Sequence, residues 1–432
     1  MRAQPIGNGH LTARVSAQFA AVLEALQLRG ASADTLRGLD DSAWLDVLAL
    51  CDRSNLTLPL ALRDYRGFPA WVTQRLQRNL ADSSDHFRRT QATYIEAASA
   101  FAGAGIPWIV LKGFTQAPDF VASPRFRLQG DIDIYTPREH VAAAVQALTR
   151  IGYISNEEED YRLADHPPTL MRFGEWRRNK NLYDPEMPLC IEIHFCLWNN
   201  MVSLVQLPEV DEFWKRRIQR SLGSLDFPAL DPVDHLGYFA LHVLREIFGA
   251  GRVAHRVLEL ATFLDTRAND TGFWNQWKSM HSPELRQAEA VAMALAADWF
   301  AAAMPPAVAE EIDSLQPVLR AWIDGCGASP LVATDGRTRD GRLLQMLLAR
   351  SRQSRWRILR RALSPGFVSG PKKLAQQPVD PTQPQKPRRN RHWTYLSYLA
   401  NRAWLNGLAI FRFVGHGLAL CVSQFAFRRA AP

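Results

Sequence analysis

Hydrophobic residues recur every three or four positions over residues 12–100 and again over residues 231–330. Representative sets are Phe19, Val22, Leu23 and Leu26 in the first stretch, and Leu236, Phe239, Leu241 and Leu244 in the second. This spacing places the apolar side chains on one face of an α-helix. The two stretches therefore predict two helical units.

Between these stretches the pattern changes to short apolar runs rich in β-branched residues. Such runs predict buried strands at residues 106–111, 130–135 and 189–195. A helix is predicted over residues 138–151, because Gly152 follows it as a C-terminal signal. Strands mixed with helices predict an α+β protein, in which a mixed sheet with helices is flanked by α-helical units.

The pattern divides the chain into four predicted segments. Residues 1–100 form an N-terminal helical unit, residues 101–220 the core, and residues 221–335 a C-terminal helical unit. Residues 336–432 comprise a basic helix, a Pro-rich linker and an apolar amphipathic end. The linker, between residues 364 and 391, has too few large apolar residues to build a core.

Charge is distributed unevenly along the 432 residues. From Arg337 to the C-terminus there are 19 Lys and Arg against two Asp, a net charge of +17. The preceding residues hold 32 basic and 41 acidic side chains, a net charge of −9. A basic end of this kind favours an anionic partner, although simple solvated charge explains it as well.

Two parts of this end suit a membrane surface. Arginines from Arg350 to Arg361 alternate with apolar residues such as Trp356, as in an amphipathic helix. Residues 403–427 are apolar, but Asn406, His416 and Gln424 interrupt them, which favours lying in a membrane interface over spanning it. The basic charge fits acidic lipid headgroups and nucleic acid equally well, so both remain candidate partners.

The cysteines and the N-terminus bear on the compartment. Five scattered cysteines with no CxxC pair indicate neither a disulfide framework nor a zinc knuckle. The first fifteen residues lack the unbroken apolar run of a secretory signal. We therefore expect a cytoplasmic protein, whose C-terminal segment has a membrane surface and nucleic acid as alternative partners.

Carboxylates mark two of the predicted strands. Asp131 and Asp133 are two positions apart, so both project from one face, while the isoleucines between them face the core. Glu192 and His194 repeat this arrangement on the third predicted strand. If these strands are neighbours, the sequence predicts a carboxylate cluster on one face of the sheet.

Clustered carboxylates repel one another unless a hard cation such as Mg²⁺ or Mn²⁺ neutralises them. Phosphoryl and nucleotidyl transfer use such clusters, because bound cations stabilise the attacking and leaving oxygens of an in-line displacement. Asp131, Asp133 and Glu192 are therefore the candidate catalytic and metal-binding residues. His194 is a further candidate, as a metal ligand or as a group that orients Glu192.

A longer motif contains these residues. It consists of an apolar strand ending in Lys112-Gly113, the segment Arg127-Leu-Gln-Gly-Asp-Ile-Asp133, a helix, and Glu192-Ile-His194. Over residues 90–200 this order resembles an uncharacterised bacterial nucleotidyltransferase family of the DNA polymerase beta superfamily. The resemblance implies a polymerase-beta-like core and transfer of a nucleotidyl group from an NTP, ATP included, to an unknown acceptor.

The resemblance also implies roles for individual residues. Asp131, Asp133 and Glu192 would hold two Mg²⁺ or Mn²⁺ ions, and Glu192 could act as general base. The nucleotide-binding residues implied by the motif are Lys112, Gly113, Arg127 and Gly130. The chain departs from the superfamily in having Gly113-Phe114 where Gly-Ser is usual, and 17 residues between Gly113 and Asp131.

Two other functions fit part of the pattern. An Asp-x-Asp glycosyltransferase that uses a sugar nucleotide explains the aspartates, but neither Lys112-Gly113 nor Glu192-Ile-His194. A non-catalytic nucleotide-binding or membrane-docking module is consistent with the altered Gly113-Phe114 turn, but not with three intact carboxylates. The acceptor, whether protein, sugar or small molecule, is not encoded in any motif that we recognise.

Overall fold

The computed structural model describes residues 15–64, 66–155, 165–172, 182–335, 338–364 and 391–430. They form two compact units. The first comprises the described residues up to Glu246 together with Arg252–Leu315. The second comprises Ile247–Gly251 and the described residues from Gln316 onward. The predicted linker lies outside the described residues, apart from its two ends.

The first unit begins with helices. They are α2 (Ala17–Leu26), α3 (Asp34–Arg37), α4 (Asp41–Ser54), α5 (Thr57–Ala61) and the long α6 (Ala70–Gly103). Asp40 caps α4 by accepting a hydrogen bond from the amide of Ala43, and Asn55 ends the helix in the left-handed conformation. The helical period of the sequence thus predicts this region correctly.

A six-stranded mixed sheet follows, in the order β3-β4-β2-β1-β6-β5. Its strands are β1 (Ile109–Val110), β2 (Asp131–Tyr135), β3 (Leu170–Met171), β4 (Cys190–His194), β5 (Ile218–Leu222) and β6 (Leu225–Ala229). The 3₁₀ helices η1 (Gly113–Gln116) and η2 (Pro124–Phe126) lie between β1 and β2. After β2 come η3 (Arg138–His140) and α7 (Val141–Arg150).

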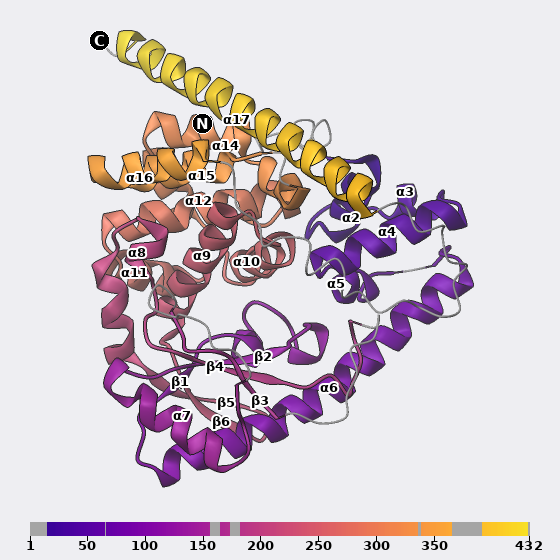
Figure 1. Ribbon diagram of the computed structural model, residues 1–432, viewed down its shortest axis with the longest axis vertical. Coiled ribbons are helices and arrows are strands. Elements are labelled where there is room, and N and C mark those ends of the chain that lie inside the picture. Colours follow the sequence, from indigo (N-terminus) through magenta and orange to yellow (C-terminus); the bar gives the residue numbers. More distant parts are fainter. Residues whose placement is uncertain are drawn as a thin grey trace. The chain divides into compact units, whose positions relative to one another are not determined.

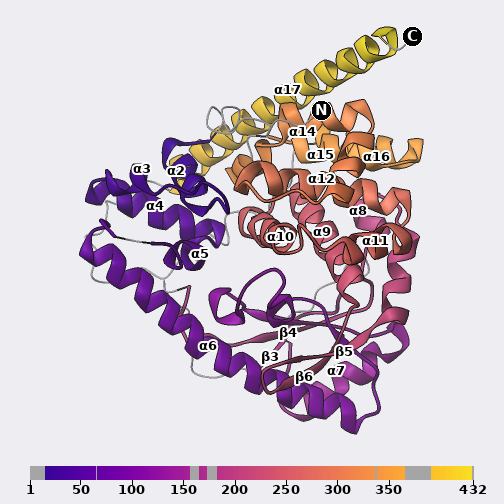
Figure 2. The ribbon, with the colours of Figure 1, turned by 180° about the vertical axis from the view of Figure 1, so that it is seen from behind.

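One face of the sheet is covered by α6 and α7 (Figure 1), and the opposite view agrees (Figure 2). Phe87, Tyr94 and Phe101 of α6 and Leu148 of α7 pack there against apolar strand residues. Burial of this apolar surface is the main stabilising contribution to such a core. Side chains that alternate with the buried ones must therefore project from the other face.

Helices complete the first unit. They are α8 (Asn200–Ser203), η4 (Pro208–Arg216), α9 (Pro232–Gly249), α10 (Ala254–Thr266), α11 (Thr271–Met280), α12 (Pro283–Phe300) and α13 (Pro306–Ser314). Aromatic side chains such as Phe239, Phe263 and Trp277 are buried among them. The last three residues of α9 belong to the second unit by their contacts.

The second unit is helical. It contains α14 (Pro317–Cys326), η5 (Ser329–Asp335), α15 (Asp340–Leu348), α16 (Arg352–Leu363) and α17 (Arg391–Ala430). Helix α17 packs along α14 and α15 and buries Ala409 and Phe413. Within it, Ala403–Val422 is long and apolar enough to cross a membrane, judged by length and composition alone.

The fold confirms the predicted α+β class and mixed sheet. The strand expected at residues 106–111 is shorter, since β1 comprises Ile109–Val110. Strands β3, β5 and β6 were not predicted, and β6 extends the sheet past residue 220. The division into four segments stays a prediction.

Candidate active site

The register of β2 and β4 brings the predicted carboxylates together. These strands pair in parallel, with Asp133 directly opposite Glu192 and Tyr135 opposite His194. Ile132 and Ile134 are fully buried in the core beneath them. Because side chains alternate along a strand, Asp131, Asp133, Glu192 and His194 share the opposite face.

His194 links the two opposed carboxylates. Its Nε2 lies 2.9 Å from Oδ1 of Asp133 and 3.6 Å from Oε2 of Glu192. Burial lowers the pKa of the imidazole, but hydrogen bonds to Asp133 and Glu192 outweigh burial and raise it above its usual value. The paired imidazole in turn helps to keep the pKa of Asp133 well below its usual range, against the effect of burial.

Lys112 binds the same carboxylate. It follows β1, and its buried Nζ lies 2.6 Å from Oδ1 of Asp133. Burial opposes the charged ammonium, but the charges of Asp133, Tyr238 and Asp131 raise the pKa of Lys112 above its usual value. Asp133 is thus paired with two basic side chains, Lys112 just after β1 and His194 of β4.

Asp131 stands in a different electrostatic position. Burial, followed by the negative charge of Asp133, raises its pKa to about 6, and Lys112 offsets only part of this. A carboxylate whose charge is disfavoured by its surroundings is one that a cation would stabilise. Asp131 therefore carries an electrostatic cost that Asp133 does not.

Glu192 is the more accessible carboxylate, with 21% of its side chain exposed against 3% for Asp133. Thr169 donates a hydrogen bond to its Oε1 at 3.3 Å, and Nε2 of His166 lies 3.7 Å from its Oε2. Burial tends to raise the pKa of Glu192, but the hydrogen bond with His194 and nearby imidazoles lower it. Glu192 is therefore ionised at neutral pH.

Asp165 and Arg245 extend the network behind His194. Oδ2 of Asp165 lies 3.8 Å from Nδ1 of His194 and 2.5 Å from a guanidinium nitrogen of Arg245. The amide of Phe195, just after β4, donates to the carbonyl of Asp165 and fixes that residue beside the strand. The imidazole of His194 is thus oriented from both sides.

Gly113 makes room for another side chain. Its φ is +76°, a conformation that L residues rarely adopt, and a Cβ there would lie 2.1 Å from Nε2 of Gln129. That amide donates to the carbonyl of Asp131 at 2.8 Å, while His86 of α6 contacts the carbonyl of Gln129 at 2.7 Å. Gly113 thereby allows Gln129 to anchor the start of β2.

Arg127 and Gly130, the other predicted nucleotide-binding residues, lie just before β2. The guanidinium of Arg127 donates to Oε1 of Glu259 on α10 at 2.9 Å, and both side chains are nearly buried. The carbonyl of Gly130 accepts a hydrogen bond from the amide of Cys190. In this structure Arg127 is therefore paired with a carboxylate and Gly130 helps to join β2 to β4.

The donor set suits a divalent cation. One ligand atom from each of Asp133, Glu192 and His194 lies within 4.8 Å of the other two. Carboxylate oxygens are the ligands that Mg²⁺ and Mn²⁺ prefer, whereas imidazole suits transition metals such as Zn²⁺ and Fe²⁺. Asp131 is not in this convergent group, although its charge is coupled to that of Asp133.

The mixed sheet is consistent with a nucleotidyltransferase fold, and comparison with known sequences identifies the family. Residues 40–301 match a family described as an uncharacterised nucleotidyltransferase, and the chain belongs to that family. The match runs from Asp40, the cap of α4, to Ala301, the residue that ends α12. Searches of curated proteins and of solved structures found no match.

Several residues of the site escaped the sequence analysis. Asp165 and His166 come from a loop with no periodic pattern, so nothing in the sequence placed them beside β4. Tyr238 and Arg245 are seven positions apart on α9, a spacing that puts them on one helical face. This spacing could have identified Tyr238 and Arg245 as neighbours on one helical face, but it could not show that this face lies over the sheet.

Proposed function

We propose that this chain transfers a nucleotidyl group from an NTP to a nucleophile on an acceptor, with the help of Mg²⁺ or Mn²⁺. The observation that carries the proposal is the register of Asp133 opposite Glu192 on adjacent parallel strands. Family membership supports nucleotidyl transfer as the general activity. The two-metal mechanism, the NTP and the acceptor are parts of the proposal.

Asp131, Asp133 and Glu192 would hold the cations, with His194 as a further ligand or as the group that positions Asp133 and Glu192. A bound cation would neutralise these carboxylates and polarise the phosphoryl oxygens. Lys112 and Arg127 place positive charge near the carboxylates, where a triphosphate would need it. Arg256 of α10 also acts on the charge of Asp131 and would add to this field.

The reaction is a substitution at the α-phosphorus. The acceptor oxygen forms a bond to that phosphorus, the bond to the β-phosphate oxygen breaks, and pyrophosphate leaves. The proton of the acceptor passes to a base, for which Glu192 is suited because it is ionised and partly exposed. Lys112 stays protonated, and its positive charge stabilises the negative charge that develops on the phosphate in the transition state.

The test uses the purified full chain with each NTP labelled at the α-phosphate, Mg²⁺ or Mn²⁺, and cell extract as the source of acceptor. Glu192→Gln and Asp131→Asn should abolish label transfer, whereas Asp46→Asn, at an exposed position of α4, should retain it. Absence of transfer by the wild type, together with no metal-dependent NTP binding by calorimetry, would overturn the proposal. A parallel assay replaces the NTP with a sugar nucleotide labelled in its sugar. Label incorporated only in that assay would favour the glycosyltransferase alternative.

We also propose that the second unit binds an anionic membrane surface. On α16 the arginines at positions 352, 355, 357, 360 and 361 are exposed, and so is 65% of Trp356. On α17 the side chains of Phe411 and Leu418 are 76% and 63% exposed. Basic charge beside exposed apolar side chains suits an anionic membrane surface, and the aliphatic side chain of Leu418 has no base-stacking partner on nucleic acid.

Vesicle sedimentation tests this second proposal. The full chain should bind vesicles that contain phosphatidylglycerol and not vesicles of phosphatidylcholine alone. Replacing Arg357 and Arg360 with Ala should weaken binding by roughly thirtyfold, since each surface cation near such a membrane contributes about 1 kcal/mol. Equal binding to neutral vesicles, or binding only to an oligonucleotide, would contradict it.

A further inference from the structure

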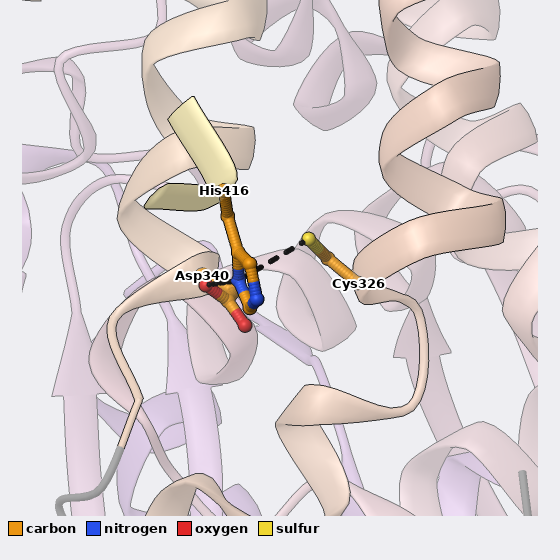
Figure 3. Close-up of side chains that lie close together, drawn as sticks. All are labelled: Cys326, Asp340 and His416. Carbon is orange, nitrogen blue, oxygen red and sulfur yellow. Dashed lines mark hydrogen bonds and ion pairs between the residues drawn. The ribbon is translucent and has the colours of Figure 1, made fainter. Parts of the chain in front are cut away.

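A second group of potential ligands lies in the second unit. Cys326 is the last residue of α14, Asp340 the first residue of α15, and His416 lies on α17. Their side chains point toward one another (Figure 3). Nδ1 of His416 lies 2.8 Å from Oδ1 of Asp340 and 3.8 Å from Sγ of Cys326. All three ligand atoms lie within 4.8 Å of one another.

This cluster is mostly enclosed and firmly positioned. Cys326 and Asp340 are buried, whereas 38% of the His416 side chain is exposed. The indole of Trp322 donates to the carbonyl of Asp340 at 3.0 Å, which fixes the start of α15. Next to it, Arg339 donates to Oδ1 of Asn406 on α17 at 2.8 Å. The three helices are therefore already held at the separation that the cluster requires.

The geometry does not suit nucleophilic catalysis. In a Cys-His-Asp triad, one imidazole nitrogen faces the thiol and the other faces the carboxylate. Here the same atom, Nδ1 of His416, is nearest to both Cys326 and Asp340. Convergence of three donors on one centre is instead the arrangement of a metal site.

The distances between the three donor atoms are close to those in a zinc site. Zn²⁺ binds thiolate at about 2.3 Å and imidazole or carboxylate at about 2.0–2.2 Å, so tetrahedral donors lie about 3.4–3.6 Å apart. The separations of 3.8 Å and 2.8 Å lie on either side of this range. A small movement of the His416 ring toward the thiol would equalise them. A mixed thiolate, imidazole and carboxylate set suits Zn²⁺ better than Mg²⁺ or Ca²⁺.

We propose that Cys326, Asp340 and His416 bind one zinc ion that fastens α17 to α14 and α15, with water as the fourth ligand. Binding displaces the thiol proton of Cys326 and any proton on Nδ1 of His416 to solvent. The ligands lie 90 and 76 positions from His416 along the chain, so no sequence motif reveals the site. The site is independent of the proposed nucleotidyl transfer.

Cobalt substitution tests the proposal directly. The full chain, stripped with a chelator and reloaded with one equivalent of Co²⁺, should show the near-ultraviolet absorption of a thiolate–cobalt bond. Cys326→Ser should lose this absorption and weaken zinc binding by more than about 100-fold. Cys421→Ser, at an exposed position of the same α17, is the matched control and should behave as wild type.

Two further measurements keep the test decisive. His416→Gln changes a more exposed position, so it should fold even if Cys326→Ser does not, and it should also lose zinc. Hydrogen exchange in α17 should become faster when zinc is removed from the wild type, but not from His416→Gln. Lack of the thiolate–cobalt absorption, with no zinc in the purified chain, would overturn the proposal and leave a buried hydrogen-bonded cluster. Glu192→Gln should leave the absorption unchanged, which separates this site from the candidate active site.

Discussion

Two regions of the first unit contain the same chemical groups in different settings. At the candidate active site, His194 lies between Asp133 and Glu192, and Lys112 binds the aspartate. In the helical region, His281 lies between Asp234 and Glu289, and Arg216 binds the aspartate through two hydrogen bonds of 2.8 and 2.6 Å. Each imidazole thus lies between two carboxylates, one of which is also paired with a basic side chain.

Accessibility separates the two networks. The side chains of Asp234, His281 and Glu289 are completely buried, whereas 21% of Glu192 is exposed. Trp277 donates to Glu289 at 2.6 Å, so this carboxylate has a hydrogen-bond donor from the protein in addition to its ion pair with His281. At the candidate active site Asp131 remains as an excess carboxylate with a raised pKa.

The difference shows what distinguishes a structural ion network from a candidate site. The helical network balances its charges internally and buries its imidazole and both carboxylates, with Arg216 partly exposed, so these carboxylates are closed to a substrate or cation. The strand network is accessible and carries more negative charge than its partners neutralise, and a substrate or cation can use that excess. Composition alone would not have separated them.

The largest expected effect is at Asp131. Asp131→Asn should lower nucleotidyl transfer by about a thousandfold or more, equivalent to roughly 4 kcal/mol. The same change should raise the free energy of unfolding by about 1–2 kcal/mol, because it removes a carboxylate whose charge is disfavoured. Transfer assays and urea denaturation without added metal measure the two effects. If Asp131→Asn kept its transfer activity and were less stable than the wild type, Asp131 would behave like a carboxylate of the buried helical network.

Asp234→Asn should act in the opposite way. It leaves Arg216 and His281 without their shared anion in a buried setting, so the free energy of unfolding should fall by about 3–5 kcal/mol. Transfer activity per folded molecule should persist at low temperature. Asp46→Asn, which is exposed on α4, provides the matched control for denaturation. Unchanged stability would show that the helical network contributes little.

Part of the pH dependence of stability should arise from His281. Burial opposes its charge, but Glu289 and Asp234 outweigh burial and raise its pKa to about 9 from 6.5. The folded state therefore holds a proton that the unfolded state releases, so the stabilisation is complete below pH 6.5 and lost as pH rises through 9. The loss should be on the order of 3 kcal/mol.

Denaturation between pH 6 and pH 10 measures this loss. The groups that face His281 are Asp234, Glu289, Arg216 through its bond to Asp234, and the stacked ring of Phe213. His281→Gln should be less stable than the wild type at pH 6. Its stability should not show the loss that deprotonation of His281 causes in the wild type at higher pH. If the variant lost as much stability between pH 6 and pH 10 as the wild type does, this loss would arise from other titrating groups.

Gly113→Ala should have the smallest effect, a loss of about 1–2 kcal/mol in the free energy of unfolding. Part of this loss arises from the strain of an L residue at φ +76°, and part from the contact of the new Cβ with Gln129. The double variant Gly113→Ala/Gln129→Ala should avoid the steric part while losing the hydrogen bond to Asp131. Thermal denaturation of both single variants and the double variant separates these contributions; strict additivity would exclude the contact with Gln129.

The sequence predicted much of the fold because its local patterns match the buried faces. Ile132 and Ile134 alternate with the aspartates, and this period of two identified both the strand and the face of the carboxylates. The condition on which the carboxylate cluster depended is met, because β2 pairs with β4 and Asp133 lies opposite Glu192. The assignment of catalytic and metal-binding roles to these residues stays a prediction.

What the sequence did not reveal depends on contacts between distant segments. Arg127, predicted as a nucleotide-binding residue, pairs with Glu259, a residue 132 positions away on α10. Strand β5 has polar residues at most positions, since it lies at the edge of the sheet, and so lacks a hydrophobic run. Cys326 and His416 meet only because three helices converge. No local pattern carries such information.

The alternation along β2 and β4 has a consequence for how this family can tolerate changes in chain length. A single-residue insertion within Asp131–Tyr135 would turn the following isoleucines away from the core and the following carboxylate into it. Between Gly113 and Gly130, whose carbonyl already bonds to β4, the chain forms 3₁₀ helices and loops, in which extra residues disturb no ladder. Inherited insertions and deletions should therefore accumulate between β1 and β2, while both carboxylate strands keep a constant length.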